Sequence, residues 1–442
     1  MIAQDTIFAP ATGFGRAGIA VIRVSGPRSR DVLASLTGGR VPEARRASVR
    51  RLLDPSDGEL LDEALVLWLP GPASFTGEDQ AELHIHGGLA VRAAVLRVLA
   101  GRPGCRSAEA GEFTRRAFLS GRMDLSSVEG LADLIDAETE AQRRQALRQL
   151  GGALARRVEG WRERLADALA LMEAGLDFSD EADVSDAASS EASAIYRAVL
   201  GDVETELTRA DRGMRLRDGF SVVIAGEPNA GKSTLLNAIS GREAAIVSPV
   251  AGTTRDAIEV HCDLGGLPVT FVDTAGLRDT SDPVELEGMA RARRRAAEAD
   301  LVLELRSPAG DAAPFVDGPF GSVPVLVVAT KGDVAPPHPG ADLVVSAVTG
   351  EGMAALLDEV RRRAETAVVG SGDAVITRER HRRAMERVAD ALRRADDVFA
   401  PGTEELAAED VRLALRALGA ITGQVDVEEI LDRIFGQFCI GK

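Results

Sequence analysis

The chain has 442 residues with an apolar content of 45%, so it is long enough for two or three domains. Its formal net charge is −17, which disfavours tight nucleic-acid binding by this chain alone. Its three cysteines are far apart, which argues against a zinc site and a disulfide framework. The first residues lack a signal-peptide pattern and the longest apolar runs are strand-sized, so we expect a cytoplasmic protein with no membrane span.

Residues 1–120 predict a small α+β domain. Strand-length apolar or alternating runs are separated there by turns rich in glycine and proline. The runs are Ile19–Val24, Ala64–Leu69 and Ala81–His86.

Residues 121–217 predict the first part of a helical domain. They are rich in Ala, Leu, Glu and Arg, and apolar residues such as Val128, Leu131 and Ile135 recur at the spacing of one helix face. The acidic stretch Asp177–Asp183 interrupts this pattern and predicts a loop.

Residues 218–370 predict an α/β domain. Short apolar, β-branched runs alternate there with helical segments, as expected for a parallel sheet covered on both faces. A sequence pattern typical of helices returns over residues 371–442, so the α/β domain is predicted to be inserted into a helical domain. The strand-like runs are Ser221–Ala225, Val269–Val272, Leu301–Leu305 and Val323–Ala329.

Lysine is rare in this chain, and its positions direct attention to function. Only three of the 52 basic residues are lysines: Lys232, Lys331 and Lys442. Where arginine serves as the general cation, a retained lysine indicates a site that needs a compact ammonium group. Two of the three lie in nucleotide-binding motifs, and the third is the last residue.

The motif Gly226-x4-Gly231-Lys232-Ser233 follows a predicted strand and opens the predicted helix Thr234–Ser240. This context identifies a P-loop, in which backbone N–H groups and the helix N-terminus surround phosphates. Lys232 is predicted to reach the β- and γ-phosphates, and Ser233 to offer its hydroxyl to Mg²⁺.

The remaining motifs follow in the order of a GTPase. Thr254 is the candidate second hydroxyl for Mg²⁺, in a switch loop. Asp273-Thr-Ala-Gly276 ends a strand and places a carboxylate near Mg²⁺ and an N–H near the γ-phosphate. Asp333 is predicted to accept two hydrogen bonds from guanine, and Ser346–Val348 to close over the base.

Two departures from the usual GTPase pattern stand out. Thr330 occupies a position where Asn is usual, which we expect to weaken loop packing more than base choice. Leu277 occupies the position of the glutamine that orients water, and no arginine finger is evident. Hydrolysis therefore requires another group to position water and another positive charge.

Together with Asn229 of the P-loop, the segments Ala251–Asp256, Asp273–Arg278 and Phe438–Lys442 resemble the MnmE family, also called TrmE. These bacterial GTPases modify the wobble uridine of tRNA and belong to the TrmE-Era-like GTPases. The resemblance covers essentially the full length, and the terminal Cys-x-Gly-Lys is its most specific part.

The resemblance implies an N-terminal tetrahydrofolate-binding and dimerisation domain like that of aminomethyltransferases, a helical domain and an inserted Ras-like P-loop GTPase domain. It also implies a homodimer that forms a heterotetramer or larger complex with the FAD-containing protein MnmG (GidA) and reaches tRNA through it. The complex would add an aminomethyl or carboxymethylaminomethyl group to carbon 5 of the wobble uridine. The one-carbon unit would come from 5-formyl- or methylene-tetrahydrofolate, with GTP/Mg²⁺ and K⁺ as further cofactors.

The resemblance further implies roles for individual residues. Glu285 would orient the attacking water, with Lys232 and Thr254 as the other catalytic residues. Arg122 departs from the lysine that is usual in the family. The implied K⁺ ligands are Asn229, Ser248, Val250 and Thr253, and the implied folate contacts are Arg23, Glu82, Arg122 and Lys442. The predicted GTP-binding residues are Asn229, Ala230, Gly231, Lys232, Ser233, Thr234, Ser248, Pro249, Val250, Ala251, Gly252, Thr253, Thr254, Asp273, Thr274, Ala275, Gly276, Thr330, Lys331, Asp333, Ser346, Ala347 and Val348.

Three alternatives remain open from the sequence. A ribosome-assembly GTPase of the Era or Der kind shares the motifs, although its RNA-binding module is usually basic and residues 371–442 are not. A folate-dependent one-carbon transferase would use GTP only for regulation. A nucleotide-gated scaffold would hold and release a partner without chemistry of its own.

Overall fold

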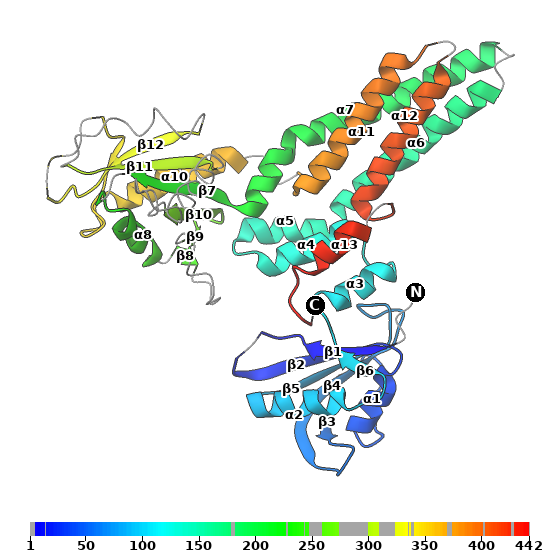
Figure 1. Cartoon of the computed structure of the whole chain (residues 1–442), viewed down its shortest axis with the longest axis vertical. Helices are drawn as coiled ribbons and strands as arrows, with labels where there is room; N and C mark the ends of the chain where they lie inside the picture. Colours follow the sequence, from blue (N-terminus) through cyan, green and yellow to red (C-terminus); the bar gives the residue numbers. More distant parts are fainter. Residues whose placement is uncertain are drawn as a thin grey trace, which may run out of the picture. The chain divides into compact units, whose positions relative to one another are not determined.

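A computed structural model describes residues 5–13, 15–177, 182–226, 229–242, 244–246, 259–273, 299–308, 323–334, 336, 340–368, 374–400, 403–425 and 428–441. The chain divides into two compact units, one spanning residues 1–132, 149–163 and 415–442, the other residues 133–148 and 164–414. Figure 1 labels their helices and strands. The four-domain division stays a prediction. No helix in the described part is both long and apolar enough to cross a membrane.

A six-stranded sheet forms the base of the first unit, with the strand order β3-β4-β5-β2-β1-β6. The three predicted runs are strands β2, β4 and β5, while β1, β3 and β6 were missed. Strand β1 is buried almost throughout and so does not alternate, and β6 has only three residues. The strands are β1 (Thr6–Pro10), β2 (Ala17–Ser25), β3 (Ser48–Leu53), β4 (Leu60–Leu69), β5 (Gln80–Gly87) and β6 (Cys105–Ser107).

One face of this sheet is covered by helices α1 (Ser29–Leu36) and α2 (Leu89–Ala100). Alternate residues of the central strands, such as Ile22 and Leu83, pack there against apolar residues of both helices. Because side chains alternate across a strand, Arg23 and Glu82 lie on the opposite face.

The first unit also contains α3 (Glu112–Leu119), α4 (Leu125–Asp136, with residues from 133 on in the second unit) and α13 (Glu428–Phe435). An apolar cluster joins these helices although they are about 300 residues apart in the chain, and it contains Leu125, Val128, Leu431, Ile434, Phe435 and Phe438. The last residues of the chain are therefore part of the N-terminal unit.

Long helices make up much of the second unit. Helix α7 (Ala182–Asp218) packs on α11 (Glu379–Val398), with Arg393 of α11 bound to Glu204 of α7 at 2.7 Å. Helix α6 (Ala153–Asp177) ends where the acidic loop was predicted, but α7 already begins at Ala182. Residues 178–181 lie outside the described part. The other long helices are α5 (Glu140–Leu150) and α12 (Glu404–Thr422), and residues 149–150 of α5, 153–163 of α6 and 415–422 of α12 belong to the first unit.

The α/β part of the second unit contains a seven-stranded sheet with the order β13-β12-β11-β7-β10-β9-β8. Neighbouring strands pair in parallel from β13 to β10, as predicted, but β9 is antiparallel to both β8 and β10. The strands are β7 (Phe220–Gly226), β8 (Ala245–Ile246), β9 (Glu259–Asp263), β10 (Pro268–Asp273), β11 (Leu301–Arg306), β12 (Val325–Ala329) and β13 (Leu343–Val344).

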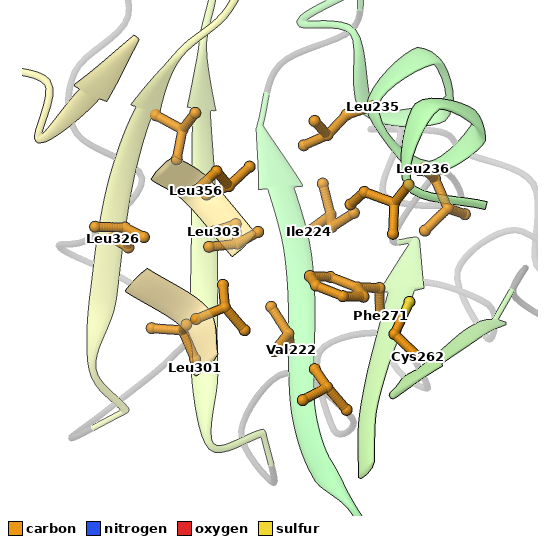
Figure 2. Packing of buried hydrophobic residues seen from close by; sticks show 14 of the residues in the cluster. Val222, Ile224, Leu235, Leu236, Cys262, Phe271, Leu301, Leu303, Leu326 and Leu356 are labelled. Carbon is orange, nitrogen blue, oxygen red and sulfur yellow. The ribbon is translucent and has the colours of Figure 1, made fainter. Parts of the chain in front are cut away.

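Helices α8 (Lys232–Ser240) and α10 (Met353–Val368) cover one face of this sheet. Figure 2 shows Leu235 and Leu236 of α8 and Leu356 of α10 packed against strand residues such as Ile224 and Phe271. A second apolar cluster, including Val223 and Val302, lies on the other face. The sheet is therefore buried on both sides, and its loops at the carboxyl ends of the strands remain for binding.

Candidate functional site

The phosphate loop joins β7 to α8, as predicted. Gly226 has φ of +148°, and a Cβ added there would lie 2.6 Å from the carbonyl oxygen of Leu305. Only glycine fits where the loop passes so close to β11. Lys232 begins α8, and its Nζ donates a hydrogen bond to the Gly226 carbonyl oxygen at 2.7 Å. The ammonium group is thereby held over the loop.

A candidate Mg²⁺ site lies at the start of α8 and the end of β10. The Ser233 hydroxyl donates to Oδ2 of Asp273 at 3.3 Å. Asp273 is only 3% exposed, and its Oδ1 atom has no hydrogen-bond partner within the described part of the chain. A buried carboxylate oxygen without a partner is costly unless a cation binds it, and Mg²⁺ prefers oxygen ligands of this kind. The residues present therefore fit Mg²⁺.

Two loops predicted to bind the base lie together at the ends of β12 and β13. The N–H of Gly332 donates to the carbonyl oxygen of Val345 at 3.2 Å. Asp333 and Val348 are exposed, so both are accessible to a ligand. Ser346 is buried, and its Oγ accepts the N–H of Thr349 at 3.1 Å. Ser346 therefore shapes the loop.

Thr330 makes a contact that the sequence did not predict. Its buried hydroxyl donates to the carbonyl oxygen of Ala230 in the phosphate loop at 2.8 Å. This bond directly links the base loop to the phosphate loop, so threonine supplies a connection between them.

We predict that Thr330→Val weakens GDP binding about 5- to 10-fold, because the Ala230 carbonyl oxygen would lose its partner at a cost of about 1–1.5 kcal/mol. Titration calorimetry measures this change. Thr349→Val is the control, since Thr349 is an exposed residue near the base loops. Equal weakening by both substitutions would contradict the specific role of Thr330.

Of the predicted K⁺ ligands, the structure describes only Asn229. It is exposed and has φ of +66°, a left-handed conformation that asparagine tolerates better than most residues. The other switch and catalytic predictions lie outside the described residues: Ser248, Pro249, Val250, Ala251, Gly252, Thr253, Thr254, Thr274, Ala275, Gly276 and Glu285.

A second polar site lies on the N-terminal sheet, on the face away from α1 and α2. Arg23 and Glu82 are opposite one another on β2 and β5 and form an ion pair at 3.2 Å, with 22% and 21% of their side chains exposed. The Arg23 guanidinium lies 5.3 Å from the ring centre of Phe75 and 5.7 Å from that of Phe113. His84 approaches the other oxygen of Glu82 at 3.4 Å. The two aromatic rings were not predicted, because each comes from a segment far from Arg23 in sequence.

The C-terminal tail lies against the same sheet. Ile440 forms an antiparallel bridge with Ala110. Gly441 has φ of +100°, and a Cβ there would overlap the carbonyl oxygen of Pro10. Since Ala9 is opposite Arg23, the tail reaches the strand that adjoins the Arg23–Glu82 pair. Lys442 itself lies outside the described residues.

Arg122 is exposed in the turn after α3, and its Cγ atom would be 3.4 Å from a Cβ added at Gly77. The structure therefore places Arg122 beside the loop that carries Phe75. Within the described residues, Arg122 forms no hydrogen bond or ion pair with Arg23 or Glu82, so their association with one ligand stays a prediction.

The three cysteines differ in environment. Burial raises the pKa of Cys262 to about 11 and also raises that of Cys105, whereas Cys439 is exposed. The thiolate is the reactive form, and at pH 8 only about a thousandth of the Cys262 thiol would be ionised, so its reaction would be slow. We expect iodoacetamide to label Cys439 first and Cys262 last, as measured by peptide mass spectrometry. Rapid labelling of Cys262 in the folded protein would contradict this order.

Comparison with known proteins extends these observations over the whole chain. Residues 125–439 match the family described as the MnmE helical domain, and residues 6–122 match the GTP-binding protein TrmE N-terminus. A Methylobacterium protein named "tRNA modification GTPase MnmE" is 62% identical over 99% of this chain and 100% of its own length. A Methylorubrum populi protein of the same name is 60% identical over 100% of this chain and 99% of its own. A solved structure of Era from Aquifex aeolicus, bound to GDP and aluminium fluoride, is 27% identical over 33% of this chain and 56% of that chain, with a TM-score of 0.27.

Proposed function

The chain belongs to the MnmE family of tRNA modification GTPases, and we propose that it is a K⁺-dependent GTPase acting in modification of carbon 5 of the tRNA wobble uridine. The observation that carries the GTPase assignment is the buried Asp273 carboxylate beside Ser233 and the phosphate loop. The relatives that match the full length are named as tRNA modification GTPases.

In the proposed reaction, Lys232 binds the β- and γ-phosphates while Ser233 and Asp273 hold Mg²⁺, with Thr254 as a further ligand. Mg²⁺ neutralises charge that develops on the phosphate oxygens. Asp333 selects guanine. The hydrogen bond from Thr330 to Ala230 fixes the base loop relative to the phosphate loop.

Two catalytic functions remain, the orientation of water and the supply of a further positive charge, and they fall to Glu285 and K⁺ respectively. Leu277 cannot orient water, so Glu285 takes this role. Asn229, with Ser248, Val250 and Thr253, seats K⁺ beside the phosphates, where it supplies the positive charge of the absent arginine finger. The exposure of Asn229 at the phosphate loop supports this assignment.

We also propose that the N-terminal sheet binds 5-formyl- or methylene-tetrahydrofolate. The Arg23–Glu82 pair can hydrogen-bond both the polar edge of a pterin and a carboxylate, and Phe75 and Phe113 offer aromatic surface beside it. The described part of the tail reaches the strand next to this pair at Gly441, and Lys442 and Arg122 complete the proposed set. The group transferred to uridine would be aminomethyl or carboxymethylaminomethyl.

The proposed partners are a second copy of this chain, the flavoprotein MnmG, and tRNA held by the complex in the cytoplasm. Exposed apolar side chains on strands of the N-terminal sheet support the homodimer. Ile19 and Val49 are 63% and 58% exposed, and Leu65 lies opposite Val49 in the adjacent strand. The net charge of −17 supports contact with tRNA through a partner rather than by this chain alone.

The function is tested by reconstitution. The chain should hydrolyse GTP, and with a flavin-bearing partner, tetrahydrofolate and unmodified tRNA it should yield a tRNA modified at the wobble uridine by mass spectrometry. Modification without the flavoprotein would favour a one-carbon transferase with regulatory GTP. Binding to ribosomal subunits with no tRNA product would favour the Era- or Der-like alternative.

A further inference from the structure

The β9–β10 hairpin connects the two segments that are proposed to sense the nucleotide. Strand β9 begins at Glu259, three residues after the switch segment Ala251–Asp256, and β10 ends at Asp273 of the Mg²⁺ site. The two strands form a continuous antiparallel ladder with five residue pairs. A paired ladder moves as one body, because sliding by one residue would turn buried side chains such as Phe271 to the other face.

The far end of this hairpin contacts the start of helix α5. The N–H of Ala141 donates to the carbonyl oxygen of Gly266 in the hairpin turn at 3.3 Å. On β9, Nδ1 of His261 lies 3.2 Å from Oε2 of Glu138, just before α5. Two independent contacts therefore join the hairpin to the same helix end.

The start of α5 is itself well ordered by its sequence. Thr139 caps the helix, since its Oγ accepts the N–H of Gln142 at 3.4 Å, and Gln142 Oε1 accepts the N–H of Thr139 at 3.1 Å. This reciprocal pair is a capping box. The Nε2 atom of Gln142 also donates to the carbonyl oxygen of Arg217 at the end of α7, at 3.0 Å. A displacement of the hairpin turn against this end of α5 would therefore act on a helix start that its own hydrogen bonds hold in place.

We infer that the β9–β10 hairpin transmits the nucleotide state to helix α5. This inference rests on the proposed GTPase function, because it requires Asp273 to respond to Mg²⁺ and the γ-phosphate. A change at Asp273 is carried along β10 and its ladder with β9 to the turn at Gly266, which lies against Ala141. The two contacts with α5, at Glu138 and Ala141, involve no residue that is assigned to nucleotide binding.

The test measures hydrogen–deuterium exchange of peptides within residues 133–150 in K⁺ buffer, with GDP and with GDP plus aluminium fluoride. In the natural protein, exchange should differ between the two states. Glu138→Ala combined with Ala141→Pro removes both contacts, and proline is tolerated in the first helical turn. This double variant should lose the difference in residues 133–150 while peptides within residues 229–240 still respond.

Glu140→Ala is the matched control, because Glu140 lies between the two substituted positions and pairs with Arg143 and Arg144 of its own helix. It should keep the full difference. Glu138→Gln alone preserves the shape of the side chain and should reduce the difference in exchange between the two states. This milder variant still tests the coupling if the double variant does not fold. The coupling would be overturned if the folded double variant kept the full difference in exchange between the two nucleotide states. It would also be overturned if the natural protein showed no such difference at residues 133–150 while residues 229–240 respond. Absence of any response together with absence of GTP hydrolysis would instead overturn the proposed function.

Discussion

Replacing K⁺ by Na⁺ should lower the rate of GTP hydrolysis about a hundredfold, and Asn229→Gly should lower it by a similar factor in K⁺. A preorganised positive group at the developing phosphate charge contributes on this scale to the transition state. Glycine is the more informative substitution, since it accepts the left-handed backbone at position 229 and removes the whole side chain, including its oxygen, without straining the loop. Steady-state phosphate release in the two salts measures both effects.

The affinity for a fluorescent GTP analogue is the control for this experiment. It should change little, because Lys232 and the loop N–H groups remain. Glu285→Ala should also stop hydrolysis without loss of binding, and it should do so in K⁺ and in Na⁺ alike. Equal turnover of the natural protein in K⁺ and Na⁺ would remove the cation from the mechanism.

Gly441→Ala should weaken binding of 5-formyl-tetrahydrofolate at least tenfold. Alanine at φ of +100° is strained, and its Cβ would overlap the Pro10 carbonyl oxygen, so the tail would leave the sheet. Lys442 would then be displaced from the proposed folate site. Deletion of Lys442 should have an effect of the same size, since both changes remove the same side chain from the site. Titration calorimetry measures the affinities.

Gly160→Ala is the matched control, because a Cβ added at Gly160 of α6 meets nothing within 4 Å. It should leave folate binding unchanged, and GTP hydrolysis should be unaffected in all three variants. Unchanged folate affinity in Gly441→Ala would separate the tail from the site, whereas absence of folate binding by the natural protein would remove the site itself.

The sequence predicted the α/β domain well because its central strands are short, apolar and bounded by motifs that occur only at strand ends. It missed β9, whose segment Glu259–Asp263 alternates polar and apolar residues beside a switch loop. The antiparallel hairpin was therefore not expected, and its contact with α5 depends on residues more than 100 positions apart. Long-range pairing of this kind leaves no local pattern.

The same limit applied to the two sites. Motif spacing predicted Lys232, Ser233 and Asp273 together, because the P-loop and the strand-end carboxylate occur in fixed structural contexts. Nothing local indicated that Thr330 would bond Ala230. For Arg23, only the resemblance pointed to a site. The surrounding rings come from a loop and a helix that approach Arg23 only in the folded sheet.

The packing of Gly441 on Pro10 has a practical consequence for handling this protein. The proposed folate site would be assembled from segments more than 400 positions apart in the sequence, so it could form only after both Pro10 and Gly441 have been synthesised. Purification tags fused to the carboxyl terminus would extend the chain at the point where it meets the sheet. Recombinant material with an untagged carboxyl terminus is therefore the suitable starting point for studying one-carbon chemistry.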